Sequence, residues 1–155
     1  MDKLELRMYG LVPYNISPIQ QGIQFQHATT RYGRFVRDLK EHEDKYNDWA
    51  DKWETSIILN GGTTNNRIVD GLYVGTLNNH KETLDKMGVL NVGMIEPDLG
   101  DQLTAVVFLV DERVFNKEKY PDWNEAYETF GHYIYRIGGT DIYDLREFLK
   151  QFRKA

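Results

Sequence analysis

The sequence predicts an α/β fold, with a mixed sheet of about four strands and helices on both faces. Short apolar runs alternate along the chain with segments whose apolar residues recur at helical spacing. The run from Ala105 to Val110 is apolar throughout, as expected for a strand buried on both faces. The chain has 155 residues, of which 41% are hydrophobic, and this is enough for one domain with a sizeable core.

The N-terminal third predicts a strand followed by a long helix. Residues 4–12 alternate between core-facing and other positions, which is typical of a strand. Ser17 can cap a helix that starts at Pro18, and Gln20 completes a capping box. We expect this helix to run towards Leu39, and the polar residues 41–51 to continue it or to form a second short helix.

Two further strands and a helix are expected before the apolar run. Residues 55–59 read as a strand that ends at Asn60-Gly61-Gly62, and residues 63–75 show no clear pattern. A helix over 76–87 is closed by Gly88, and a strand follows over 89–95. After a loop over 96–101, the apolar run forms a strand over 103–110.

Two extra helices are predicted at the C-terminus, over residues 111–155. The first carries six apolar residues at helical spacing and the second carries five: Trp123, Ala126, Tyr127, Phe130, Ile134 and Ile137, then Ile142, Leu145, Phe148, Leu149 and Phe152. Since no linker divides the chain, we expect a single domain over residues 1–155, with the C-terminal helices as its extension.

Composition narrows the classes of function. The chain has no cysteine, which excludes disulfides, thiolate nucleophiles and Cys-ligated metals. No apolar run is long enough to span a membrane, and the N-terminus lacks the apolar core of a signal peptide. We therefore expect a cytoplasmic protein that does not bind membranes. The net charge of −5 leans against nucleic acid unless the basic residues gather in one place.

A polar stripe on the first helix is the first candidate site. Its members lie at positions i, i+4, i+7, i+11 and i+14: Gln20, Gln24, His27, Arg31 and Arg34. Amides, an imidazole and two guanidiniums on one face would suit an anion or a polar substrate, and a histidine can act as acid or base near neutral pH. The alternative, which spacing alone favours, is a solvated helix face.

The loop after the third strand is the second candidate. Glu96, Asp98 and Asp101 place carboxylates near the end of a strand, and Thr104 begins the next strand. A carboxylate here would orient an imidazole or activate a water molecule, whereas the alternative is ordinary turn chemistry. Gly61-Gly62 is a third candidate, for phosphate, but a simple turn is the better interpretation.

The residues also resemble a known family. Gln24 and the pair His27-Ala28, on a helix that follows a first strand, resemble the opening of the type 2 peptidyl-tRNA hydrolases. Similarity continues through residues 53–59, 86–89 and 96–110, and so covers about residues 4–110. Residues 15–24, 59–63 and 96–99 resemble more closely a group of tailed-bacteriophage proteins related to these hydrolases.

The resemblance implies an activity and a set of roles. The family hydrolyses the ester between a peptide and the tRNA 3′ end, without a metal or cofactor. By matching position, His27 would be the catalytic or substrate-orienting imidazole, with Glu96 or Asp98 as the loop carboxylate and Thr104 as the strand threonine. Gln20, Gln24, Arg31 and Arg34 would bind the substrate. Gln20 stands where the family has a lysine, and the family's loop is shortened and rewritten here.

Three functions remain open at this point. The first is an ester hydrolase acting on peptidyl- or aminoacyl-tRNA. The second is a catalytically silent relative that binds tRNA or a nucleotide-like ligand. The third is a phage protein that binds a host protein. Gln24 and His27 favour the first, while the missing lysine and the acidic charge balance favour the other two.

Overall fold

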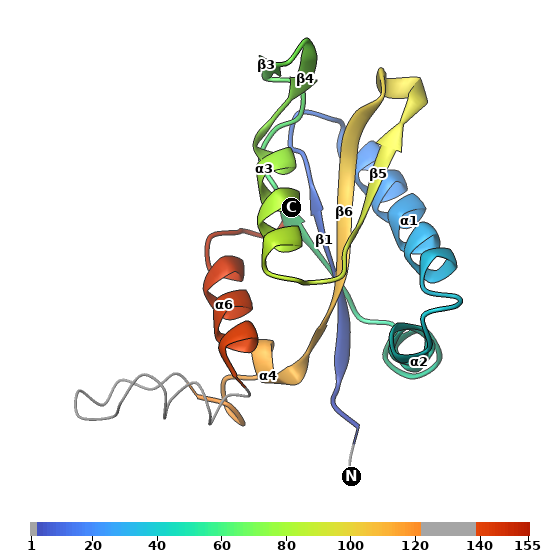
Figure 1. Cartoon of the computed structure of the whole chain (residues 1–155), viewed down its shortest axis with the longest axis vertical. Coiled ribbons are helices and arrows are strands. Elements are labelled where there is room, and N and C mark those ends of the chain that lie inside the picture. Colours follow the sequence, from blue (N-terminus) through green and yellow to red (C-terminus); the bar gives the residue numbers. More distant parts are fainter. Residues whose placement is uncertain (1–2, 122–138) are drawn as a thin grey trace, which may run out of the picture.

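A computed structural model describes residues 3–121 and 139–155 of the chain, which are built around a four-stranded sheet of order β2-β1-β6-β5 (Figure 1). The strands are β1 (Leu6–Val12), β2 (Ser56–Asn60), β5 (Val92–Glu96) and β6 (Gln102–Asp111). β1 pairs parallel with β2 and antiparallel with β6, which also pairs antiparallel with β5. The α/β class and the mixed four-stranded sheet are confirmed.

Three of the four strands end at the same end of the sheet. β1, β2 and β5 run the same way, because β1 and β5 are each antiparallel to β6. Their carboxyl ends therefore meet, together with the start of β6, at what we call the carboxyl edge. Open α/β sheets commonly carry their binding sites at such an edge.

Helices cover both faces of the sheet, as expected. One face packs against α1 (Pro18–Phe35), α2 (Lys40–Asp48) and the π-helical turn Trp49–Trp53, while the other packs against α3 (Thr76–Lys86), α4 (Glu112–Phe115) and α6 (Thr140–Leu149) (Figure 1). Alternate residues of β1 explain this division: Met8 faces α1, and Leu11 faces α3. Both side chains are fully buried.

The first helix begins at Pro18 as predicted and ends earlier, and the Gln20 side chain pairs with Gln24 instead of completing a capping box. Ser17 Oγ accepts a hydrogen bond from the Gln20 amide at 3.3 Å, and Pro18 occupies the first turn. The helix ends at Phe35 because the chain turns at Val36, which stays buried in the core, and restarts at Lys40 as α2. The prediction of one helix towards Leu39 followed its apolar spacing beyond this turn.

The segment without a clear pattern forms a β-hairpin. β3 (Arg67–Val69) pairs antiparallel with β4 (Leu72–Val74), and these two strands form a sheet of their own. The turn residues Asp70 and Gly71 have φ values of 52° and 79°. Positive φ at both positions is the mark of a type I′ turn, for which Asp-Gly is a preferred pair.

Other elements lie close to their predicted positions. The third predicted strand begins at Val92 rather than residue 89, because Gly88, with a φ of 74°, ends α3 and a short connection follows. The second C-terminal helix is α6, which ends at Leu149 before Phe152, and α4 was not predicted. The first C-terminal helix, with Trp123 to Ile137, lies outside the described residues. No helix among the described residues is long and apolar enough to cross a membrane.

Candidate functional site

A buried glutamine on α1 is the centre of the candidate site. The helix lies against β5 and β6, and its N-terminal half is at the carboxyl edge (Figure 1). Gln24 is only 1% exposed, although its side chain ends in a carboxamide. A buried carboxamide needs hydrogen-bond partners, since an unsatisfied one costs free energy.

Gln24 finds these partners in a chain of three side chains. Thr104 Oγ1 donates to Gln24 Oε1 at 2.6 Å, and Gln24 Nε2 donates to Gln20 Oε1 at 3.2 Å. Because Gln20 Oε1 is the acceptor, its Nε2 is left as the outer donor of the chain. The chain therefore runs from the sheet to a half-buried amide group on the helix surface.

A β-bulge aims Thr104 at the helix. In the pairing of β5 with β6, Met94 lies opposite Ala105 and Ile95 lies opposite Leu103, so Thr104 is the extra residue between them. Its hydroxyl also lies 3.2 Å from the Met94 carbonyl oxygen. Bulges commonly redirect a side chain next to a functional site, and this one turns Thr104, which is fully buried, toward α1.

His27 follows Gln24 by one helical turn and is half-buried. Its Nδ1 atom is buried and has no hydrogen-bond partner within the part of the chain that the structure describes. Most buried polar atoms in proteins do have a partner, so this nitrogen is one of the few groups here with unused bonding capacity. Since Nδ1 is closed off from solvent, a bound molecule would meet the imidazole through its other nitrogen, Nε2.

The rest of the polar stripe is more exposed. Arg31 and Arg34 both point to solvent, and no ion pair to either is formed by the described residues. The helix face is therefore buried and hydrogen-bonded at Gln24 and solvated at the two arginines. The alternative interpretation, a solvated helix face, therefore describes the two arginines and not Gln24.

The predicted carboxylates lie in the turn between β5 and β6. Glu96 ends β5 and is half-buried, while Asp98 lies in the 3₁₀ turn Pro97–Leu99 and is exposed. No hydrogen bond joins either carboxylate to His27 among the residues described. The structure brings Gln20, Gln24 and Thr104 into contact, and it leaves the two carboxylates unlinked to the imidazole.

One anchoring contact was not predicted from the sequence. Asn15 Nδ2 donates to the Thr64 carbonyl oxygen at 2.6 Å, and the Thr64 amide donates to Asn15 Oδ1 at 3.1 Å. These two bonds tie the loop before α1 to the base of the hairpin. The partners are 49 residues apart, and no local pattern signals such a pairing.

The described residues give little support to a phosphate site at Gly61-Gly62 or to a metal site. The Gly61 amide donates to the Val12 carbonyl oxygen at 2.8 Å and the Gly62 amide donates to Asn60 Oδ1 at 2.9 Å, so neither is available to a phosphate. In the described part of the chain, no three acidic or histidine side chains gather as a metal site would require.

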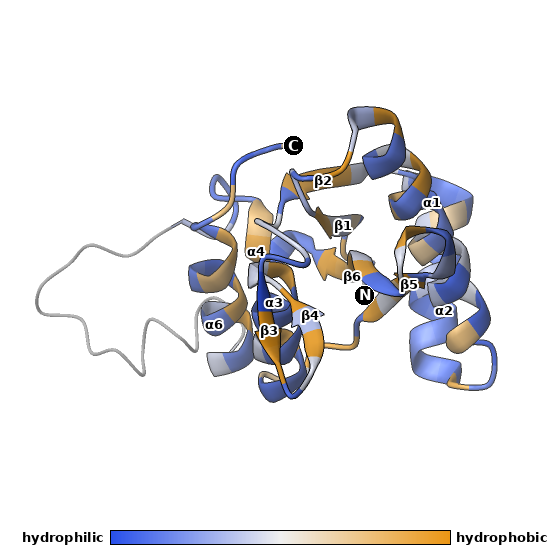
Figure 2. Cartoon of the chain, turned by 90° about the horizontal axis from the view of Figure 1, so that it is seen from above, coloured by the Kyte–Doolittle hydropathy of each residue, from blue (hydrophilic) through white to orange (hydrophobic). Residues whose placement is uncertain are grey.

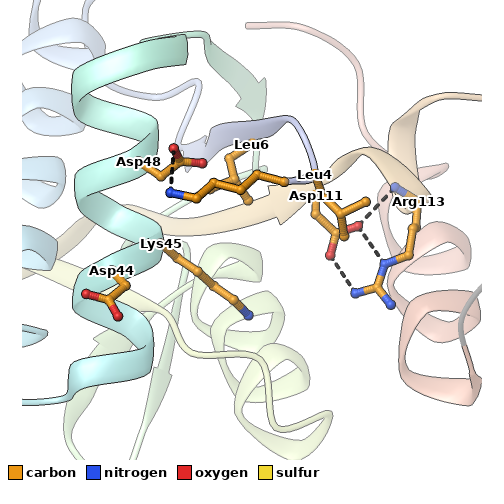
Figure 3. Close-up of a pocket in the computed structure, with 8 residues that line it drawn as sticks. Leu4, Leu6, Asp44, Lys45, Asp48, Asp111 and Arg113 are labelled. Atoms are coloured by element: carbon orange, nitrogen blue, oxygen red, sulfur yellow. Dashed lines mark hydrogen bonds and ion pairs between the residues drawn. The ribbon is translucent and has the colours of Figure 1, made fainter. Parts of the chain in front are cut away.

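A cavity of about 260 Å³ lies at the opposite edge of the sheet (Figure 3). Its charged groups neutralise one another. Lys3 Nζ lies 3.6 Å from Asp48, and Arg113 forms a hydrogen-bonded ion pair with Asp111 at 2.8 Å. That hydrogen bond raises the pKa of Arg113 above its ordinary value. A charged ligand would have to break these pairs, so the cavity is a weaker candidate than the α1 face.

Comparisons with known proteins do not assign the chain to a family. No protein-family model matches the chain, and no curated protein is found as a relative.

Proposed function

We propose that the chain is a metal-independent ester hydrolase of the type 2 peptidyl-tRNA hydrolase kind, which cleaves a peptidyl or aminoacyl ester at a tRNA 3′ end. The observation that carries the proposal is the buried Thr104–Gln24–Gln20 hydrogen-bond chain beside the half-buried His27. The resemblance assigns functional roles to Gln24, His27 and Thr104, and Gln24 and Thr104 are in direct contact. A plain solvated helix face would not require a β-bulge and a buried carboxamide.

Two side chains carry out the proposed reaction: His27 transfers the proton and Gln20 stabilises the oxyanion. His27 takes a proton from water as the water oxygen attacks the ester carbonyl carbon. Gln20 Nε2, the outer donor of the chain, donates a hydrogen bond to the oxyanion that forms. The bond from carbon to the ribose oxygen then breaks, and the proton passes from His27 to that oxygen. Glu96 or Asp98 would orient the imidazole once substrate is bound.

Gln20 sets an expected limit on the rate. A neutral amide stabilises an oxyanion less than the cationic lysine that the family has at this position. We therefore expect a slower hydrolase than the family pattern would give. The exposed arginines of α1, Arg31 and Arg34, would contact the phosphates of the tRNA end and compensate in part for the acidic charge of the chain.

The experiment follows the release of N-acetylated amino acid from N-acetylaminoacyl-tRNA by the full chain. His27→Ala should slow the release by a factor of about 100 or more, because general acid–base groups typically contribute that much. His42→Ala, a histidine on α2, is the matched control and should leave the rate unchanged. Binding of tRNA without turnover would identify the catalytically silent relative and refute the hydrolase.

A further inference from the structure

Exposed apolar side chains gather at the carboxyl edge. Nine large hydrophobic side chains are exposed in the described part of the chain. Two of them lie away from that edge: Phe35, the last residue of α1, and Leu39, just before α2. Four belong to the hairpin: Ile68, Val69, Leu72 and Tyr73. The other three are Tyr14, Ile19 and Ile95, from the loop before α1, the first turn of α1 and the end of β5.

The hairpin is exposed on both of its faces. Ile68 lies opposite Tyr73, and Val69 lies opposite Leu72 on the other face. Ile68, Leu72 and Tyr73 are each 60% exposed or more. Figure 2, seen from above, shows the apolar colour along β3 and β4. Contiguous apolar surface on a monomer commonly marks an interaction site, and two-stranded hairpins are marginal in water without a packing partner.

The backbone of the hairpin is also available. β3 and β4 hydrogen-bond only with one another, although β4 also lies near β6, so the outer edge of each strand has no hydrogen-bonded strand beside it. Such an edge can accept an extended segment of another chain by backbone hydrogen bonds. The type I′ turn at Asp70-Gly71 fixes the register of the two strands, and therefore the hairpin presents a defined edge.

The negative charge around the apolar surface indicates which kind of partner binds there. Four carboxylates lie at this edge, at Asp70, Glu96, Asp98 and Asp101, and none of them forms an ion pair within the described residues. The only cation of the hairpin, Arg67, donates to Asn79 Oδ1 at 2.5 Å. An acidic rim repels a second copy of the same edge, and it attracts lysine and arginine.

We propose that the carboxyl edge binds an extended protein segment with alternating apolar and basic side chains, which adds as a strand to the hairpin. Because alternate side chains of the added strand point to opposite faces of the hairpin, its apolar side chains lie beside Leu72 on one face, and its basic side chains lie beside Tyr73 on the other face and pair with the carboxylates of the rim. The apolar part of this surface belongs to the hairpin and not to α1, whereas the carboxylates of Glu96 and Asp98 lie where it adjoins the proposed ester site.

The test measures the fluorescence anisotropy of a labelled ten-residue peptide of alternating Val and Lys, added to the full chain. We expect saturable binding that weakens as NaCl rises from 50 to 300 mM, because exposed charge pairs are screened. A peptide of alternating Val and Glu should bind at least tenfold more weakly. Equal binding of the two peptides, or no binding of the basic one, overturns the proposal.

Two sets of variants locate the surface. The double change Leu72→Thr and Tyr73→Thr keeps strand propensity and should weaken binding at least tenfold, whereas Phe35→Gln and Leu39→Gln, away from the carboxyl edge, should not. Asp70→Asn and Asp101→Asn keep the left-handed backbone that both positions adopt and should weaken binding about threefold at low salt. Asp38→Asn is their charge control.

Three outcomes contradict the proposed peptide surface. Binding that the hairpin variant does not weaken overturns the proposal. Dimerisation that the hairpin variant abolishes would show that a second copy covers the edge. Loss of tRNA binding in the hairpin variant would assign the surface to nucleic acid. Hydrolysis of N-acetylaminoacyl-tRNA is measured in parallel, and its presence or absence bears only on the proposed function.

Discussion

At the scale of the residue, the hydrogen bond between Thr104 and Gln24 makes a direct prediction about stability. Thr104→Val keeps the shape but removes the hydroxyl, so Gln24 Oε1 loses its donor while it stays buried. We expect a loss of about 1 to 3 kcal/mol in the free energy of unfolding, measured by urea denaturation. Thr104→Ser keeps the donor and should lose less. Equal losses for the two variants would show that the hydrogen bond contributes little.

His80 predicts a pH dependence. It packs edge-on against Phe148 and Phe152, with ring centroids 5.9 and 4.7 Å away, and burial lowers its pKa below the ordinary value of 6.5. Below about pH 6.5 the unfolded chain binds a proton that the folded chain does not. The contribution of His80 is therefore fully present above that pH and is lost as pH falls through the lower, folded pKa.

The thermal midpoint of the wild-type chain should therefore fall more steeply between pH 7 and pH 5 than that of His80→Gln, measured by circular dichroism. Parallel curves for the two proteins would assign the pH dependence to other groups. The variant also removes the contact with Phe152, so the slopes are compared and not the absolute midpoints.

The individual site residues were predictable to different degrees. Helical spacing alone grouped Gln20, Gln24 and His27 on one face, and the position of Thr104 at the start of the strand after the acidic loop singled it out as well. The contact between Gln24 and Thr104 was not predictable from either, because it depends on a bulge that inserts one residue between two paired positions. The bulge has no local sequence signal here, since it contains neither glycine nor proline.

At the scale of the element, the packing of α1 on β1 depends on a glycine. A Cβ atom at Gly10 would lie 2.3 Å from the ring of Phe25, which is itself buried against the sheet. Gly10→Ala should therefore cost about 1 to 3 kcal/mol in the free energy of unfolding, since the ring has little room to move.

Gly22 supplies the matched control on the same helix. A Cβ atom there would meet nothing within 4 Å, and the residue lies inside α1. Gly22→Ala should stabilise the chain by about 0.5 to 1 kcal/mol, because alanine is the better helix former. If both substitutions destabilise equally, backbone freedom and not the close approach of Phe25 explains the effect.

The elements themselves were predicted unevenly, for physical reasons. α1 was found because Ser17, Pro18 and Gln20 give a strong start signal, and β6 because it is buried on both faces. The hairpin was missed because its three-residue strands are too short to show alternation, although Asp70-Gly71 is a preferred turn pair. The early end of α1 was missed because Val36 continues the apolar spacing past the turn.

At the scale of the whole molecule, the fold class followed from the order of apolar segments, while the strand order did not. Parallel pairing of β1 with β2 and the central position of β6 depend on contacts between distant residues. The gathering of the carboxyl ends at one edge follows from that topology. It explains why residues of α1, the hairpin and the β5–β6 turn share one end of the molecule (Figure 1).

The basic face of α1 predicts how tRNA would bind. Arg31→Gln with Arg34→Gln should weaken tRNA binding and reduce the slope of log affinity against log salt by about 1.4 to 1.8, if each arginine contacts one phosphate. Lys86→Gln with Arg153→Gln removes the same charge away from α1 and should leave the slope unchanged. Equal effects would indicate attraction by overall charge and not a defined contact.

The central claim is that the His27 face of α1 cleaves an ester at a tRNA 3′ end. The most direct measurement is the initial rate of N-acetylaminoacyl-tRNA cleavage by the full wild-type chain, divided by the rate of His27→Ala at the same folded concentration. We predict a ratio of about 100 or more, with the wild-type rate well above spontaneous hydrolysis. A wild-type rate equal to that of the variant would contradict the claim.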